Sequence, residues 1–364
     1  MEAAPASSAT IPVVPLEQAD SIWNRLRFSA DGRLRAESTF DQVNGVDRHR
    51  GRLRFRVGAD YDLMPDVKLG ARISTLSDGR DANNPHWDFG DGDGFEGGEL
   101  GLDRFFLEWK VCEAVALTGG KFAHPFTRPP VLRELAWDDD VQPAGVAALW
   151  KPSMTGKFGF DVRATHVVAA EVNESGDGTG SDPAMTGLQG NATWKASETT
   201  DLSLGTSYSH WSGVDDLAVA DIQGNTADAE HFAIWDTFLA GTVRGGPLHQ
   251  TTAFAQYFNN VDDESGEDTG FAVGVQVGKS SKKDDWNLFA AYYDVDANAV
   301  FSAVAQDDTP IAGTGTGDGM EGFVLGGQYL VADNVSLKLW VLTSDAGESD
   351  DPYRVRFDID FRLL

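Results

Sequence analysis

The sequence lacks the features that organise most small secreted domains and most helical membrane proteins. Its 364 residues include a single cysteine, Cys112, which argues against a disulfide framework. No apolar run approaches the roughly 18 residues of a transmembrane helix, and almost no segment has apolar residues at the i, i+3, i+4, i+7 spacing of an amphipathic helix. These absences exclude a membrane-spanning helix and leave β-strands as the expected building unit.

Common catalytic motifs are missing as well. None of the seven histidines has the H-x-x-x-H spacing of a metal site, and the chain contains neither a G-x-S-x-G nucleophile elbow nor a Walker loop. His166 and His210 could pair with a serine or an aspartate across strands, but the sequence shows no such pairing. We therefore expect no catalytic residues, no enzymatic activity and no cofactor.

What the chain does contain is a strand with two different faces. In Arg48–Gly58 an arginine occupies every second position, opposite a strip that includes Leu53, Phe55 and Val57. A period of two is the period of a β-strand, whose successive side chains point to opposite faces. Five cations cannot be buried in a dry core because each would lose its hydration without a partner. The arginine face must therefore look into water.

Charged residues also alternate with apolar ones at both ends of the chain, in residues 30–37 and 354–363. Two such strands side by side would close a barrel with a charged, wet lumen and an outer face that meets lipid. About sixteen strand-like segments follow one another, and a barrel of that size has a lumen too wide for side chains to fill. The segments begin near Leu26, Arg50, Val67, Leu102, Val115, Gly145, Lys157, Ala184, Asp201, His231, His249, Thr269, Trp286, Glu321, Val335 and Tyr353.

The links between these segments alternate in length, which is typical of bacterial outer-membrane barrels with short periplasmic turns and long external loops. Tight turns fall at residues 64–66, 112–114, 245–247 and 332–334, and the long links run through 38–47, 77–99, 125–144, 171–183, 213–230, 259–267 and 296–319. We predict an all-β, antiparallel transmembrane β-barrel over residues 22–364. Aromatic residues stand where strands should leave the hydrocarbon, among them Trp109, Trp150, Trp194, Phe238 and Trp340.

The third long link is too apolar in its middle to be a free external loop. Val131, Leu132, Leu135 and Trp137 need burial, which an inward fold onto the barrel wall would provide. Its acidic residues would then face the arginines across the narrowest point and set the selectivity of the channel. The residues predicted to line this constriction are Arg33, Arg35, Arg52, Arg54, Arg56, Arg72, Arg104, Lys121, Glu134, Asp138, Asp139 and Asp140. A solvated acidic surface loop is the alternative.

The net charge of −28 comes mostly from the long links. Acidic loops repel nucleic acid and favour divalent cations or a salt-rich habitat. Residues 88–99 approach the spacing of a calcium loop, but Phe89 and Leu100 stand where an EF-hand needs ligands. We therefore reject an EF-hand and keep a looser structural Ca²⁺ site. Its candidate ligands are Asp88, Asp91, Asp93 and Glu96.

Several blocks carry a family resemblance. Residues 48–58, 102–109, 119–126 and 134–147 resemble the bacterial "putative porin" family, which is distantly similar to the phosphate-selective porins. The resemblance covers about residues 26–150, and beyond them only the architecture is similar. It implies a pore in the outer membrane of a Gram-negative bacterium, commonly a homotrimer, with the third loop at the constriction. The resemblance does not identify which solute the pore transports.

We therefore expect an outer-membrane porin that passes small hydrophilic solutes and ions by diffusion and contacts the lipid bilayer and lipopolysaccharide. The first residues are acidic and lack the apolar core of a signal peptide, so we expect the leader to have been removed and residues 1–21 to form a flexible periplasmic lead-in. The alternatives are an outer-membrane barrel enzyme of the lipase or protease type and a soluble all-β binding protein.

Overall fold

The structure is a computed structural model that describes residues 22–40, 46–76, 85–89, 98–154, 156–169, 182–214, 225–226, 231–306, 319–344 and 352–363. Their regular secondary structure is almost entirely β-strand. The strands are β1 (Leu26–Phe40), β2 (Arg48–Met64), β3 (Val67–Leu76), β4 (Trp87–Asp88), β5 (Glu99–Cys112), β6 (Val115–Lys121), β7 (Ala144–Trp150), β8 (Phe158–Val168), β9 (Ala184–Lys195), β10 (Thr200–Ser212), β11 (Phe232–Arg244), β12 (Gln250–Asn260), β13 (Thr269–Lys279), β14 (Trp286–Val295), β15 (Met320–Ala332), β16 (Val335–Thr343) and β17 (Tyr353–Arg362).

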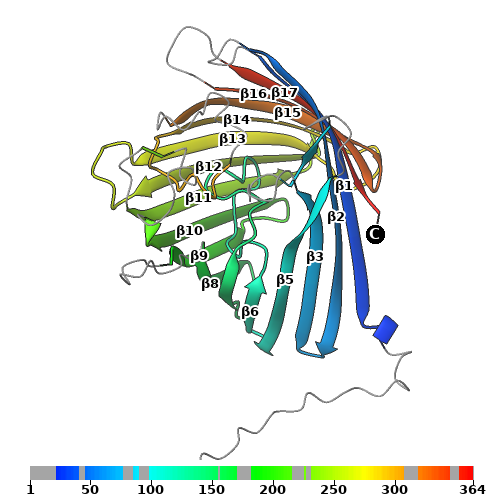
Figure 1. Cartoon of the computed structure of the whole chain (residues 1–364), viewed down its shortest axis with the longest axis vertical. Coiled ribbons are helices and arrows are strands. Elements are labelled where there is room, and N and C mark those ends of the chain that lie inside the picture. The colour runs from blue at the N-terminus through cyan, green and yellow to red at the C-terminus, as the bar shows by residue number, and fades with distance from the viewer. Residues whose placement is uncertain are drawn as a thin grey trace, which may run out of the picture.

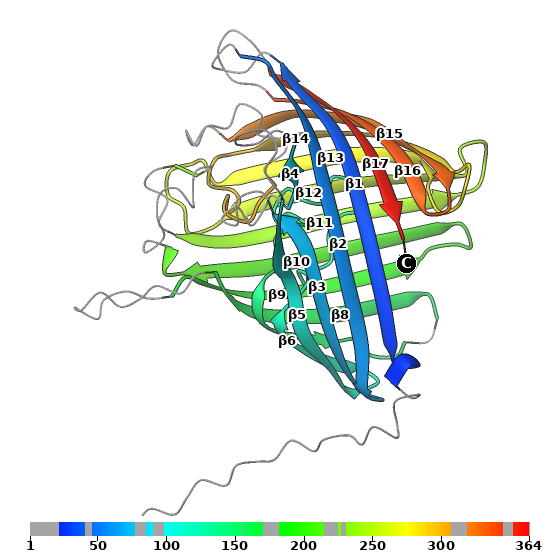
Figure 2. The ribbon, with the colours of Figure 1, turned by 45° about the vertical axis from the view of Figure 1, so that its right-hand side comes forward.

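Apart from the two-residue β4, each described strand pairs antiparallel with the next one along the chain, and β17 pairs back with β1. The result is the predicted closed barrel of sixteen strands, with β4 added beside β2. Figures 1 and 2 both show β1 and β17 side by side, at the place where the barrel closes. We call this pairing of β17, β1 and β2 the seam. The seam joins segments more than 300 residues apart in the sequence, such as Arg33 and Asp360.

The hydrophobic pattern located the strands because lipid outside and water inside impose a strict period of two. Every predicted segment start lies within three residues of an observed strand start. Tight turns join β2 to β3, β5 to β6 and β15 to β16, as predicted. The strand that sequence patterning missed is β4, because a two-residue strand is too short to show a period.

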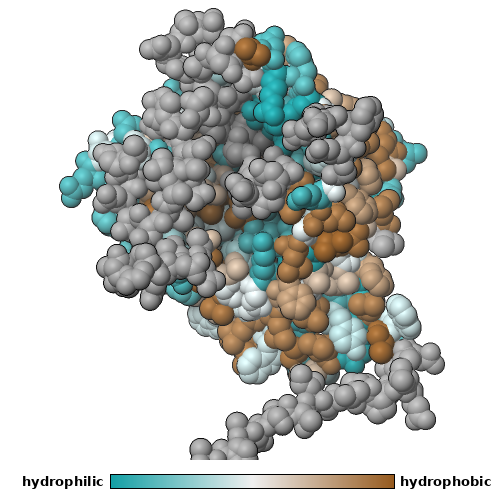
Figure 3. Space-filling view, viewed as in Figure 1, coloured by the Kyte–Doolittle hydropathy of each residue, from teal (hydrophilic) through white to brown (hydrophobic). Residues whose placement is uncertain are grey.

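The outer face of the barrel is apolar. Outward side chains such as Leu34, Phe105, Leu239 and Leu325 are exposed, Phe105 to 51 %. Figure 3 shows apolar side chains gathered over the lower part of this face of the barrel. Since contiguous exposed hydrocarbon of this extent is unfavourable in water, the outer wall fits a lipid environment. Among the described residues, no helix is long and apolar enough to span a membrane.

Aromatic rings collect on the outer wall near the short-turn end. Phe158 stacks on Trp194 with ring centroids 5.7 Å apart, and Trp150 meets Phe160 edge to face at 5.2 Å. Two aromatic residues expected at this interface instead face the lumen. Phe238 is buried beside Gly205 of β10, and Trp340 borders an internal cavity.

Candidate functional site

The lumen contains one strongly basic wall. Arg33 and Arg35 come from β1, Arg52, Arg54 and Arg56 from β2, Arg72 from β3 and Arg104 from β5. We call these seven side chains the arginine wall. They share one side because the alternation of each strand turns every second residue inward and the antiparallel register aligns these positions across neighbouring strands.

Carboxylates on adjacent elements pair with most of this wall. Arg35 binds Asp358 through two hydrogen bonds of 2.7 and 3.0 Å, and Arg33 binds Asp360 at 2.6 Å. Arg52 Nε donates to Asp88 of β4 at 2.6 Å. Because these pairs span β17, β1, β2 and β4, they tie the two ends of the chain together on the lumen side.

Glu37 is the central carboxylate of the seam. Its two oxygens accept hydrogen bonds of 2.5 Å from Arg356 and from Arg50. The Arg356 side chain is 0 % exposed and that of Glu37 is 1 % exposed. Each charge of so deeply buried an ion pair depends on the other, because a lone charge at that depth is unfavourable by several kcal/mol.

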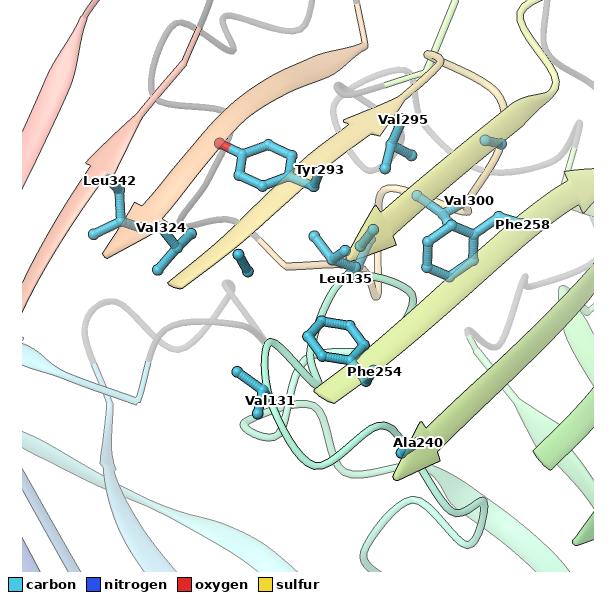
Figure 4. Packing of buried hydrophobic residues seen from close by; sticks show 14 residues of the cluster. Val131, Leu135, Ala240, Phe254, Phe258, Tyr293, Val295, Val300, Val324 and Leu342 are labelled. Atoms are coloured by element: carbon cyan, nitrogen blue, oxygen red, sulfur yellow. The ribbon is translucent and has the colours of Figure 1, made fainter. Parts of the chain in front are cut away.

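Residues 122–143, which link β6 to β7, fold into the lumen as predicted. We call them the constriction segment. Leu135 is fully buried, at 0 % exposure, and Val131 and Trp137 are buried as well. Figure 4 shows Val131 and Leu135 packed among Phe254 and residues of β14 and β15 on the far wall. Burial of these apolar side chains holds the segment inside the barrel.

Gly187 shows how closely the segment approaches the wall. A Cβ atom at this position would lie 2.8 Å from the ring of Phe126. Gln189, two residues along β9, accepts a 2.7 Å hydrogen bond from Thr127 N and donates one of 2.9 Å to Thr127 O. A glycine and a glutamine on one strand thus dock the start of the constriction segment.

A second segment also folds inward, which the sequence did not predict. Residues 296–306 were expected to begin a long external link, but they pack against the constriction segment, and we call them the plug segment. Val304 O accepts a 2.8 Å hydrogen bond from Asp138 N. Phe301, which is 1 % exposed, packs on Trp211 with ring centroids 4.3 Å apart. The remainder of this link, residues 307–318, lies outside the described residues.

Asparagines anchor the plug segment to a neighbouring link and to the end of β12. Asn225 Nδ2 donates to Ala297 O at 2.7 Å and to Val300 O at 2.8 Å. Asn260 Nδ2 donates to Asn298 O at 3.0 Å. The signal that could have indicated this fold is the apolar stretch from Ala297 to Ala305 within an otherwise polar link.

The acidic residues of the constriction segment play three different structural roles. Asp140 reaches the arginine wall, with its carboxylate 3.1 Å from Arg54 and 3.5 Å from Arg56. Asp139 instead pairs with Arg128 and lies 3.4 Å from Arg133 in its own segment. Asp138 is buried and accepts a 2.7 Å hydrogen bond from Asp140 N. Burial alone would raise the pKa of Asp139, but Arg128, Glu134 and Arg133 together outweigh it and hold that pKa below its ordinary value.

These side chains border one internal cavity of about 480 Å³. It brings together the whole arginine wall with Glu134, Asp138, Asp139 and Asp140. The sequence analysis did not predict two other lining residues, His86 and Lys338. Lys338 Nζ lies 3.3 Å from the centroid of the Trp340 ring.

One predicted constriction residue lies elsewhere. Lys121 does not border the cavity, since the strand register pairs it with Phe105 and Ala144, both exposed. The alternation of β6 is regular here, because Leu117, four residues before Lys121, is exposed as well and the register is unbroken between them. A period of two along β6 therefore places Lys121 on the outer face with Leu117, and the prediction of a lumen position was wrong because it did not apply this period.

The candidate calcium ligands are described only in part. Asp88 pairs with Arg52 at 2.6 Å and Arg50 at 3.0 Å, so a cation there would compete with two guanidinium groups. Asp91, Asp93 and Glu96 lie outside the described residues. Within the part of the chain that the structure describes, no cluster of three or more His, Cys, Asp or Glu could hold a metal ion.

The comparisons with known proteins agree with this architecture. A family model with the description "Putative porin" matches residues 36–230 and 222–362. A high-pH structure of Pseudomonas putida OprB is similar with a TM-score of 0.61 at 15 % identity, covering 95 % of this chain and 96 % of that chain. A mutant of Rh. blastica porin is similar with a TM-score of 0.53 at 12 % identity, covering 93 % and 100 %. No curated protein matches.

Proposed function

Since this chain belongs to the putative porin family and forms an outer-membrane porin barrel, we propose that small hydrophilic solutes and ions diffuse passively through its lumen. The arginine wall and the acidic side of the constriction segment set which of them pass. The family and the fold indicate a channel rather than an enzyme. We propose that the mature protein, without its leader, conducts ions and solutes in the outer membrane.

The cavity carries this proposal. Its lining includes all seven side chains of the arginine wall, and the carboxylate of Asp140 approaches Arg54 from the opposite side. Even with these ion pairs, so many polar N–H groups and carboxylate oxygens around one space of about 480 Å³ favour water within it. A charged space of this kind inside a sixteen-stranded barrel supports an ion-conducting channel.

Planar bilayer recording tests the proposal. We expect purified protein to give stable open-channel current steps that rise linearly with voltage. Folding is checked separately by the β-sheet signal in circular dichroism. Folded, inserted protein that gives no current would contradict the proposed function.

We also propose that the barrel contacts lipopolysaccharide and assembles as a homotrimer. The exposed apolar outer wall supports contact with lipid or with other subunits. The measurement is the mass of the native protein in mild detergent. A monomer under conditions that preserve the barrel would contradict the trimer without affecting the channel.

A further inference from the structure

The strand register places arginines directly opposite one another at three points of the arginine wall. The three cross-strand pairs are Arg35 with Arg52, Arg33 with Arg54, and Arg72 with Arg104. Like charges directly opposite each other on one face of a sheet are destabilising, so each pair needs compensating negative charge.

Two of the pairs receive a carboxylate for each arginine. The pair of Arg35 and Arg52 lies between Asp358 and Asp88, at 2.7 and 2.6 Å. The next pair lies between Asp360, at 2.6 Å from Arg33, and Asp140, at 3.1 Å from Arg54. These two pairs are therefore neutralised by the protein itself.

The third pair is different. Arg72 pairs with Asp103, but Arg104 Nε donates at 2.7 Å to a neutral oxygen, Oε1 of Gln142. Gln142 is fixed in this orientation because its amide nitrogen donates to Asp139 O at 2.7 Å. Among the described carboxylates, none forms an ion pair with Arg104.

A β-bulge creates this imbalance. The register of β3 and β5 passes from Arg72 opposite Arg104 to Ile73 opposite Leu102, so Asp103 is the extra residue. A bulge re-aims a side chain, and here it places a single carboxylate beside two guanidinium groups. Arg72 Nη2 is left buried with no hydrogen-bond partner in the described structure, and both arginines border the cavity.

We propose that Arg72 and Arg104 bind the carboxylate of a small monocarboxylate solute as it passes through the channel. Two guanidinium groups and one carboxylate leave a single positive charge, which one monovalent anion neutralises. The planar, forked guanidinium donors match the geometry of a carboxylate, and the unused N–H groups of Arg72 gain an acceptor. This site rests on the proposed channel function, since a solute reaches it only through the lumen.

Single-channel conductance measured against salt concentration tests the site. In potassium acetate we expect conductance to saturate, because a bound carboxylate must leave before the next one passes. Arg104→Gln removes the unpaired charge and raises the half-saturating acetate concentration by roughly tenfold or more, as expected for loss of a charged hydrogen bond. Lys68→Gln is the matched control. Lys68 lies on β3 like Arg72, but it pairs with Glu108 at 3.5 Å and does not border the cavity.

Each outcome separates the site from the channel. No current in KCl overturns the proposed function, and the site with it. Conductance in KCl without saturation in acetate, or saturation unchanged by Arg104→Gln, overturns the site alone. If Arg104→Gln does not fold, Arg104→Lys decides, since it keeps the charge but loses the fork; an unchanged half-saturating concentration would then contradict the site. Inorganic phosphate that binds more tightly than acetate would contradict the choice of a monocarboxylate.

Discussion

The two halves of this lumen are stabilised in opposite ways. The half formed by β17 and β1 to β5 presents charged side chains that pair with one another, whereas β11 to β15 present apolar side chains such as Phe254, Phe258 and Tyr293. The constriction and plug segments pack on the apolar half. The open cavity therefore lies against the charged half. Inward-folded segments pack on the apolar part of the inner wall, and the cavity stays open beside the charged part.

Loss of the central carboxylate should affect the charged half most. We expect Glu37→Gln to destabilise the barrel by about 3–5 kcal/mol, because the fully buried Arg356 loses the charge that it binds. The measurement is chemical unfolding in detergent followed by circular dichroism. Asp62→Asn, at an exposed pair with Arg27, is the control and should change little. An equal loss of unfolding free energy in both variants would contradict the larger role of the buried ion pair.

The apolar half should respond next. Leu135→Ala removes a fully buried side chain, which typically destabilises by about 2–5 kcal/mol. The loss falls on the docking of the constriction segment, so single-channel conductance should rise and become noisier while the barrel remains folded. Leu135→Met conserves volume and should leave the current nearly unchanged. A quiet, unaltered current from the alanine variant would mean that the constriction segment does not narrow the channel.

A single acidic residue should account for most of the selectivity on the acidic side. Asp140→Asn removes a carboxylate that pairs with Arg54 and Arg56 of the arginine wall, so the reversal potential in a salt gradient should shift toward anions. Asp139→Asn should shift it less, because Asp139 pairs within its own segment. A larger shift from the Asp139 variant would reverse this assignment.

The smallest predicted effect is a pH dependence of docking. Burial, and then the charge of nearby Arg128, holds the pKa of His124 well below its ordinary value, with Arg163 adding to and Asp139 opposing this shift. Free histidine has a pKa of about 6.5. Docking is therefore fully stable above that pH and weakens as pH falls below it, by at most about 1.4 kcal/mol per unit.

Hydrogen exchange in residues 122–143, corrected for the intrinsic effect of pH, measures this dependence. We expect faster exchange at pH 5 than at pH 7 in the native protein and a smaller change in His124→Gln. The same pH response in both proteins would show that another group controls docking.

The sequence was sufficient for the barrel because its pattern depends only on local alternation between lipid and water. The inward fold of residues 122–143 was also predictable, since Leu135 and Trp137 could not remain exposed. The plug segment was missed because its apolar residues are small, apart from Phe301, and gain burial only through contacts with segments distant in the sequence. The separate pairings of Asp139 and Asp140 likewise depend on backbone geometry that spacing does not encode.

The seam also determines which strands can close the barrel. In the native register Arg33, Arg35 and Glu37 lie opposite Asp360, Asp358 and Arg356, so every facing pair is of opposite sign. A slip by one residue would turn the charges into lipid. A slip by two residues in either direction would place Arg35 opposite Arg356 or Glu37 opposite Asp358.

Before closure, β1 and β17 are open edges of a growing sheet, and such edges can pair with the wrong chain. Two copies of β1 paired around Arg33 or Arg35 would bring arginine against arginine. When the barrel closes, the alternating charges thus favour the pairing of β1 with β17 of the same chain over the pairing of either strand with another chain.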